Sequence, residues 1–199
     1  MPTPNQSGLF AGLLALYSSA VVSETVIVNL EAPSTDGFYT GISNLRGWAV
    51  AESGIASIEI DVDGTYAFDV PMGGMRGDVA RVYPDFPDSD TSGFSMAYNY
   101  KGLSPGEYVF TARAISKDGG VATDSATVKV DRFLSSYIGD SSEVDTSTVS
   151  EVSFGDASFT LKGLTVEGHQ WDVVMDFDTA TQSFEIADIA EVGLSLIHI

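Results

Sequence analysis

Short runs of alternating apolar and polar residues recur from Val26 onward, and they constrain the fold of this chain more than any other feature. In residues 58–62, two isoleucines and a valine alternate with two acidic residues, and Asp63-Gly64 then provides a tight turn before a second alternating run. Period-two alternation places every second side chain on one face of a β-strand. No apolar period of 3.6 residues persists over three turns, so the sequence predicts a chain made mainly of strands and hairpins.

The alternation also predicts which side chains enter a core. The predicted inward-facing residues are Ile58, Ile60, Val62, Tyr66, Phe68, Val70, Phe94, Met96, Tyr98, Tyr100, Tyr108, Phe110, Ala112 and Ala114. About seven strands of this kind fall within roughly 105 residues, which is the number and spacing of a two-sheet, immunoglobulin-like sandwich. The predicted fold class is therefore all-β, with a small antiparallel β unit after the sandwich.

Residues 45–71, 76–94 and 103–120 carry the most specific motifs of the predicted sandwich, among them Gly-Trp-Ala at 47–49. On these motifs, residues 26–131 resemble the bacterial immunoglobulin-like (Ig-like) β-sandwich domains of exported modular proteins. Domains that share a fold serve many roles, so the resemblance implies a spacer, adhesion or accessory binding module and no reaction of its own.

Composition divides the chain into five parts. Residues 1–23 contain an apolar run that ends in small residues, as in a secretory signal peptide, and a buried helix or strand is the alternative. Residues 24–133 form the predicted sandwich, 134–152 a Ser/Thr-rich acidic linker, and 153–190 a small β-hairpin unit. Residues 191–199 fit neither pattern and are either a genuine final strand or a tail foreign to the protein.

The hairpin unit is predicted to have one apolar and one acidic face. Trp171, Val173, Met175 and Phe177 alternate with Asp172, Asp176 and Asp178, and Phe184 and Ile186 begin a third strand. The apolar residues change parity at Gly163, which indicates a β-bulge. Three strands cannot bury such a face alone, so the unit is expected to pack against the sandwich or against a second copy of itself.

The charge balance and the missing residue types exclude several functions. The chain has 28 acidic and 9 basic residues, a net charge of -19, which disfavours binding to nucleic acid or to anionic membrane surfaces. It has no cysteine and two histidines, which removes thiol chemistry and leaves little for a histidine-based zinc site. No nucleophile elbow, phosphate loop or metalloprotease helix motif occurs, so we predict that the chain is not an enzyme.

The tripeptide Arg76-Gly77-Asp78 matches the sequence that animal cell-adhesion receptors recognise. A three-residue match has a high false-positive rate. The resembled domains carry an Arg and an Asp-Val pair at this place, so we expect a structural role instead. Arg76 is expected to pair with nearby carboxylates, and Asp78 to cap a helical turn that begins at Val79.

Aromatic residues form one candidate ligand site. Tyr83 and Phe86 lie in a predicted loop and, with Trp48, Tyr66 and Trp171, could stack on sugar rings. Burial is the alternative, because period-two spacing already explains most of these residues as core.

Oxygen-bearing residues form a second candidate site, for calcium. Asp88, Asp90 and Ser92 alternate ahead of a glycine like the first half of a calcium loop, with Asp85 as an extra ligand. An EF-hand would place a glutamate where this chain has Asn99, so an acidic solvated loop is the alternative.

These observations predict a noncatalytic, exported Ig-like module that serves as an accessory, spacer or adhesion domain of a cell-surface or secreted protein. It would act in the periplasm, at the cell surface or outside the cell, on a protein or glycan partner, without membrane insertion once the signal is removed. The alternative is a carbohydrate-binding appendage of a polysaccharide-acting enzyme, since paired carboxylates are plentiful.

Overall fold

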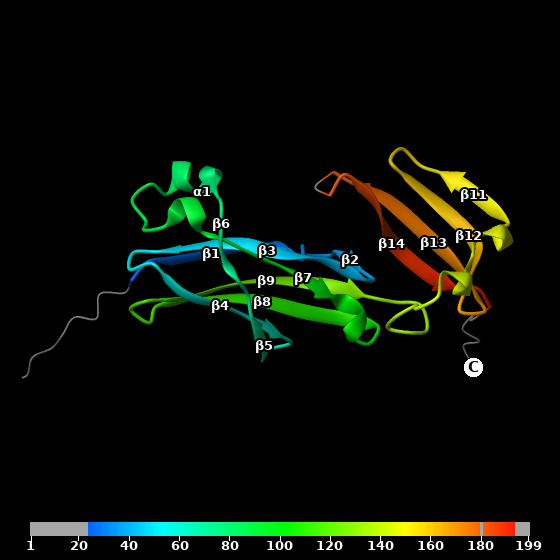
Figure 1. Cartoon of the computed structure of the whole chain (residues 1–199), viewed down its shortest axis with the longest axis horizontal. Helices are drawn as coiled ribbons and strands as arrows, with labels where there is room; N and C mark the ends of the chain where they lie inside the picture. The colour runs from blue at the N-terminus through cyan, green and yellow to red at the C-terminus, as the bar shows by residue number, and fades with distance from the viewer. Residues whose placement is uncertain (1–23, 180, 194–199) are drawn as a thin grey trace, which may run out of the picture.

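The computed structural model describes residues 24–179 and 181–193, which form a β-sandwich followed by a smaller β-sheet unit (Figure 1). One sandwich sheet has the order β1-β3-β7-β6 and the other β2-β9-β8-β4-β5. The strands of the first sheet are β1 (Val26–Ala32), β3 (Ile42–Ala51), β7 (Gly93–Asn99) and β6 (Met72–Gly74). Those of the second are β2 (Phe38–Tyr39), β9 (Val121–Val130), β8 (Gly106–Ser116), β4 (Ile55–Val62) and β5 (Thr65–Asp69).

The strand order is that of an immunoglobulin sandwich. Strands β1, β3, β4, β6, β7, β8 and β9 correspond in chain order to strands A to G, since one sheet pairs A-B-E-D and the other pairs C, F and G. Strand β5 extends the second sheet beside β4, and β2 pairs in parallel with β9. The predicted all-β, immunoglobulin-like fold is therefore confirmed.

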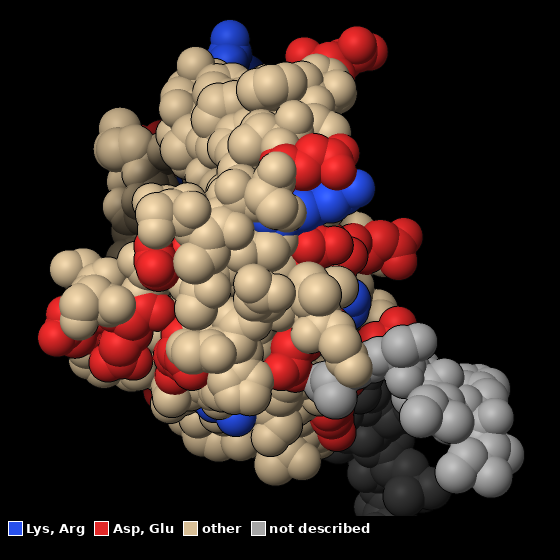
Figure 2. Space-filling model, turned by 90° about the vertical axis from the view of Figure 1, so that its right-hand side faces the viewer, with Lys and Arg blue, Asp and Glu red and all other residues tan. Residues whose placement is uncertain are grey.

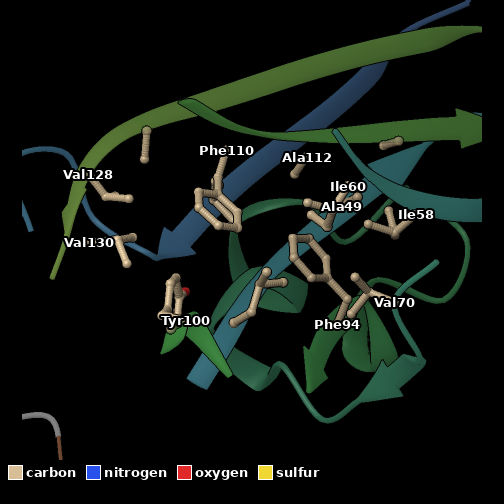
Figure 3. Packing of buried hydrophobic residues seen from close by; sticks show 14 residues of the cluster. Ala49, Ile58, Ile60, Val70, Phe94, Tyr100, Phe110, Ala112, Val128 and Val130 are labelled. Atoms are coloured by element: carbon tan, nitrogen blue, oxygen red, sulfur yellow. The ribbon is translucent and has the colours of Figure 1, made fainter. Parts of the chain in front are cut away.

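Side chains from both sheets meet in one core, as the alternation predicts (Figure 3). Leu45 and Phe94 come from the first sheet, and Ile60 and Phe110 from the second; each is at most 2% exposed. Gly47 is needed at its place in β3, because a Cβ atom there would collide with the Asn29 carbonyl oxygen and the Phe94 ring. Close approach of backbone to side chain at the core thus explains the glycine of the Gly-Trp-Ala motif.

The prediction that Tyr66 faces the core is wrong. Its side chain is 54% exposed, and its hydroxyl donates to Asp69. The register between β4 and β5 shifts at one point, since Ile60 pairs with Phe68 but Asp61 pairs with Tyr66. A bulge of this kind adds one residue to one strand, so side chains before and after it point to opposite faces.

Tyr100 is fully buried, and its hydroxyl has no hydrogen-bond partner in the described part of the chain. Burial is the main cause that raises the pKa of this hydroxyl above its ordinary value. An unpaired polar group in a core costs free energy that a phenylalanine of the same shape does not. We therefore expect Tyr100→Phe to raise the free energy of unfolding by about 1 kcal/mol in a urea titration.

Tyr39→Phe is the matched control for this substitution. The Tyr39 ring stacks on Tyr100 at 4.5 Å between centroids, but its hydroxyl accepts a hydrogen bond from the backbone N–H of Ser34. Removing a hydroxyl that has a partner should lower the free energy of unfolding by about 1 kcal/mol. If both variants lose stability, the Tyr100 hydroxyl has a partner in solution.

A short insertion between β6 and β7 lies over the outer face of the first sheet (Figure 1). It contains α1 (Gly77–Val82) and the 3-10 turn η1 (Ser89–Thr91). Val79 of the helix is 3% exposed, and Val50 of β3 is fully buried although it lies outside the main core. The insertion therefore covers part of the outer face and places the residues between Arg76 and Ser92 there.

The C-terminal unit is a five-stranded antiparallel sheet. Its order is β10-β12-β13-β14, with β11 also paired to β12, and it comprises β10 (Val144–Asp145), β11 (Glu151–Phe154), β12 (Ser158–Val166), β13 (His169–Asp178) and β14 (Ser183–Glu191). The predicted bulge is confirmed, because the register of β12 shifts around Gly163, whose φ is +74°. Residues 134–152, predicted as a linker, include β10, the start of β11 and the turns η3 (Ser141–Glu143) and η4 (Thr146–Thr148).

The C-terminal sheet packs against one end of the sandwich. Phe133 and Trp171 meet edge to face at 5.3 Å between ring centroids, and Phe38 of β2 joins the same apolar cluster. Lys129 and Asp188 add an ion pair at 3.1 Å. The near half of the apolar face of the sheet is thus covered by the same chain, as the expectation of packing against the sandwich requires.

Candidate functional site

Arg76 is held by two carboxylates. Its Nε donates to Asp78 Oδ1 at 2.9 Å, and its Nη2 donates to Asp78 Oδ2 at 2.6 Å and to Glu31 Oε1 at 2.8 Å. The Arg76 side chain is 18% exposed, and its guanidinium holds the pKa of Asp78 well below the usual range of an aspartate. Both charged side chains of the Arg-Gly-Asp tripeptide therefore bind within the protein, which confirms the expected pairing of Arg76 with carboxylates.

The predicted cap by Asp78 is wrong. Helix α1 begins at Gly77, two residues earlier than expected, with Arg76 at the N-cap position and no side-chain hydrogen bond to the cap. Asp78 lies in the first turn, where a negative charge favours the helix dipole, but its carboxylate oxygens accept from Arg76. The Asp78 carboxylate thus forms a bidentate ion pair with Arg76 instead of capping the helix.

Arg76→Gln should lower the free energy of unfolding by about 1–2 kcal/mol at neutral pH, because it removes charge-assisted hydrogen bonds that join the insertion to β1. Because the pKa of Asp78 is lower in the folded chain than in the unfolded chain, ionisation of this carboxyl stabilises the fold. This stability is fully present above the unfolded aspartate pKa of about 3.9 and is lost as the pH falls below that value. The difference between wild type and variant should thus be constant from pH 7 to about pH 5 and shrink below about pH 4 in thermal melts.

Arg81→Gln is the control for that comparison. Arg81 lies on the same helix, is exposed, and donates from Nε to the Gly77 carbonyl oxygen at 3.1 Å. It should change the melting temperature little at any pH. Equal losses in the two variants would show that helix charge, and not the Arg76 ion pairs, holds the insertion.

Three of the five candidate aromatic residues lie together on the outer face of the first sheet. Trp48 projects from β3 and lies 5.5 Å from Tyr83, and Tyr83 meets Phe86 edge to face at 5.8 Å, as measured between ring centroids. All three side chains are half-buried. The helix ends at Val82, and the backbone N–H of the C-cap residue Tyr83 donates to the Val79 carbonyl, which places the Tyr83 ring between Trp48 and Phe86.

The other two aromatic candidates lie elsewhere. Trp171 is 7% exposed in the core of the C-terminal unit, and Tyr66 projects from β5 in the other sandwich sheet. Neither can belong to a shared stacking platform. Ligand binding by Tyr83 and Phe86 stays a prediction.

The residues of the predicted calcium site are only partly brought together. Asp88 and Ser92 line a cavity of about 280 Å³ with apolar residues such as Ala49 and Met72, but Asp90 does not line it. Asp88 lies 3.9 Å from Lys117 Nζ. No group of three or more Asp, Glu or His side chains placed to hold a metal ion occurs among residues 24–179 and 181–193. Calcium binding at Asp88, Asp90 and Ser92 stays a prediction.

The carboxyl groups of Glu24, Asp78, Asp140 and Asp145 have lowered pKa values. The main cause in each is a hydrogen bond to the carboxylate: from the Ser116 hydroxyl to Glu24, from Arg76 to Asp78, and from Ser142 and Ser147 to the other two. A glycosidase needs one carboxyl with a raised pKa to act as general acid. These four groups are shifted in the opposite direction, so they serve as hydrogen-bond acceptors and not as acids.

The C-terminal sheet has an exposed apolar surface; the sequence predicted an apolar face on this unit but not that part of it stays exposed. Its rings, here called the phenylalanine row, are Phe154, Phe159, Phe177 and Phe184. Phe154 pairs with Phe159 across β11 and β12, and Phe184 meets both Phe159 and Phe177 edge to face at 5.1 and 5.3 Å between centroids. Phe154 is 83% exposed, Phe184 50% and Phe177 37%. Contiguous exposed apolar rings mark interaction surfaces more often than isolated ones do.

No protein-family model and no curated protein matches the chain. Among solved structures, the fibronectin(III)-like modules of CbhA from Clostridium thermocellum align over 53% of this chain and 98% of that chain, at 18% identity and a TM-score of 0.34. CopC from Methylosinus trichosporium OB3b aligns over 57% and 100% of the two chains, at 16% identity and a TM-score of 0.34.

The N-terminal Ig1-2 module of the Drosophila receptor protein tyrosine phosphatase DLAR aligns over 84% of this chain and 96% of that chain, at 12% identity and a TM-score of 0.36. Scores this low carry no inference about function. The class of the protein, an all-β chain with an immunoglobulin-like sandwich, is defined by its own strand order. No helix in the described ranges is long and apolar enough to cross a membrane.

Proposed function

We propose that the chain is a noncatalytic accessory module of an exported modular protein, acting as an adhesion or spacer domain. The observation that carries this proposal is the phenylalanine row, an exposed apolar surface on a sheet whose other half packs against the sandwich. A sheet that packs against a sandwich by one half and presents an exposed apolar surface by the other is suited to bind another macromolecule.

The chemistry of the described residues supports a noncatalytic role. The ion pairs of Arg76 and the hydrogen bonds of the lowered carboxylates hold loops and turns in place. Catalytic carboxyl pairs need a cleft in which one group keeps its proton. In the described part of this chain, the charged groups whose pKa values are shifted form ion pairs and hydrogen bonds that hold the fold together.

Two measurements test the proposal. Expressed in a bacterial host, the exported product should have the intact mass of a chain that begins at Glu24, because residues 1–23, which lie outside the described residues, are predicted to be removed. The Glu24 carboxylate is anchored by the Ser53 backbone N–H at 2.7 Å and by the Ser116 hydroxyl. The purified chain should turn over no substrate in a panel of soluble polysaccharides; turnover of any of them would overturn the noncatalytic role.

A carbohydrate-binding appendage is the second candidate, favoured by the cluster of Trp48, Tyr83 and Phe86. On a glycan array, Tyr83→Ala and Phe86→Ala should then lose the binding that wild type shows. Tyr66→Ala is the matched control, since this tyrosine is exposed on the other sheet. Thermal melts of each variant separate lost binding from lost folding, because the Tyr83 ring contacts two other rings.

A further inference from the structure

We propose that strand β11 and the phenylalanine row bind an extended polypeptide segment of a partner in which apolar residues alternate with Lys or Arg. The segment would pair with the edge of β11 and continue the C-terminal sheet by one strand. This inference rests on the proposed function as a binding module and specifies its partner.

The backbone of β11 has groups directed away from the sheet. Within the described ranges β11 pairs with β12 alone, and it lies on the side of the unit away from the sandwich (Figure 1). The Gly155 N–H donates to the Ser158 carbonyl at 2.9 Å and closes a two-residue hairpin. In an antiparallel ladder, hydrogen-bonded and non-hydrogen-bonded pairs alternate, so Val152 and Phe154 direct their N–H and C=O groups outward.

The same two residues contribute side chains to the exposed apolar face. Val152 pairs with Leu161 and Phe154 with Phe159, and all four side chains share the face that Trp171 and Val173 occupy near the sandwich. Val152 is 44% exposed and Phe154 83%. A strand hydrogen-bonded to this edge would therefore place every second side chain on this face, along Val152 and Phe154, where apolar residues remove the two side chains from water.

The opposite face of the sheet is acidic. Glu151, Asp172 and Asp176 lie on it by their register, with Lys162 as the basic residue, and Lys162 pairs with Glu151 at 3.3 Å. Figure 2 shows the end of the molecule that the C-terminal unit forms, where acidic groups are spread among uncharged surface and basic groups are fewer. The alternate side chains of an added strand would lie on this face next to Glu151, and the net charge of -19 favours Lys and Arg there.

Charge also decides between this partner and a second copy of the chain. Pairing two β11 edges would bring together two molecules of net charge -19, whose repulsion opposes association. A segment that alternates apolar and basic residues gains the same backbone hydrogen bonds and the same apolar contacts without that repulsion. Its affinity should fall as salt screens the attraction, whereas self-association should strengthen.

The test uses the full chain and a fluorescent nine-residue peptide in which Val alternates with Lys, with capped ends. By anisotropy the peptide should bind at least about tenfold more tightly than a peptide of the same composition with all Val residues before all Lys residues. Raising monovalent salt from about 50 to 300 mM should weaken binding by about tenfold. Equal binding of the two peptides would overturn the proposal, because charge alone would then account for it.

Variants test the edge itself. Val152→Pro removes one outward N–H without breaking a hydrogen bond to β12, so it should keep the melting temperature and lose about tenfold in affinity. Phe154→Ala should also lose affinity, while Val121→Ala, at a valine 55% exposed on the sandwich, should not. Peptide affinity that neither β11 variant reduces would overturn the proposal.

Self-association and turnover are the remaining outcomes. Dimerisation that strengthens with salt and disappears in Val152→Pro would identify a second copy as the occupant and overturn the proposed partner. Failure of the peptide to bind, with no polysaccharide turnover, would remove this partner but leave the accessory role standing. Turnover would instead remove the accessory role, so the two failures are distinguishable.

Discussion

Phe110→Ala should destabilise the sandwich by about 3–5 kcal/mol, because it deletes a fully buried aromatic ring and leaves a cavity. Phe110 projects from the central strand β8, and its ring lies 5.6 Å from Tyr98 and 5.5 Å from Tyr100 between centroids. Figure 3 shows it between the two sheets. Urea unfolding followed by tryptophan fluorescence, to which Trp48 and Trp171 both contribute, would measure the loss as a lower midpoint of the sandwich transition with an unchanged slope.

Val109→Ala is the control for Phe110, because it lies next to it on the outward face of the same strand and is 39% exposed. Its effect should be within about 0.5 kcal/mol, the range of ordinary surface substitutions. A loss below about 1 kcal/mol for Phe110→Ala would contradict the core described here. A larger loss for Val109→Ala than for Phe110→Ala would instead place the register of β8 one residue away.

The period-two pattern predicted most of the sandwich because burial on one face dictates residue parity. In β8 the alternation assigned Phe110, Ala112 and Ala114 to the core, and all three are fully buried. Gly163 was identifiable for the same reason: apolar parity switches there, and only an added residue can keep both halves on one face.

The features that sequence reasoning missed depend on contacts between distant segments. The bulge between β4 and β5 exposes Tyr66 but leaves no sign in the sequence. Tyr66, Phe68 and Val70 are spaced two residues apart, so the alternation assigns all three to the core whether or not a bulge is present. Strand β10 and the start of β11 lie in a Ser/Thr-rich acidic stretch with low strand propensity, and their pairing with β12 forms them.

The candidate surfaces were predictable only in part. The parity of Phe177 and its neighbours was evident, but which half of their face the sandwich covers depends on where Phe133 and Phe38 dock. Likewise Arg76 was expected to find a carboxylate, but its partner Glu31 is 45 residues away in the chain and comes close only through β1. The alternation in the sequence predicts which side chains share one face of a sheet. The packing of the other segments against that face decides which of those side chains are exposed.

Trp171→Ala should destabilise the C-terminal unit by about 3–5 kcal/mol, because Trp171 is 7% exposed at the centre of the second apolar cluster. It should leave the sandwich folded, since the sandwich has its own core. A Glu-specific protease should then cut the variant faster than wild type at the exposed Glu143 and Glu151, inside the predicted linker 134–152, and leave a resistant fragment that contains the sandwich.

Phe184→Ala is the control for Trp171, because its ring belongs to the same sheet face but is 50% exposed, so its removal should cost much less. The two-unit division predicts that Trp171→Ala shifts one of two unfolding transitions and Phe110→Ala the other. If each variant instead lowers a single transition of the whole chain, then the contacts of Phe133 and Phe38 couple the sheet to the sandwich so strongly that both unfold together, and residues 134–152 are not a linker.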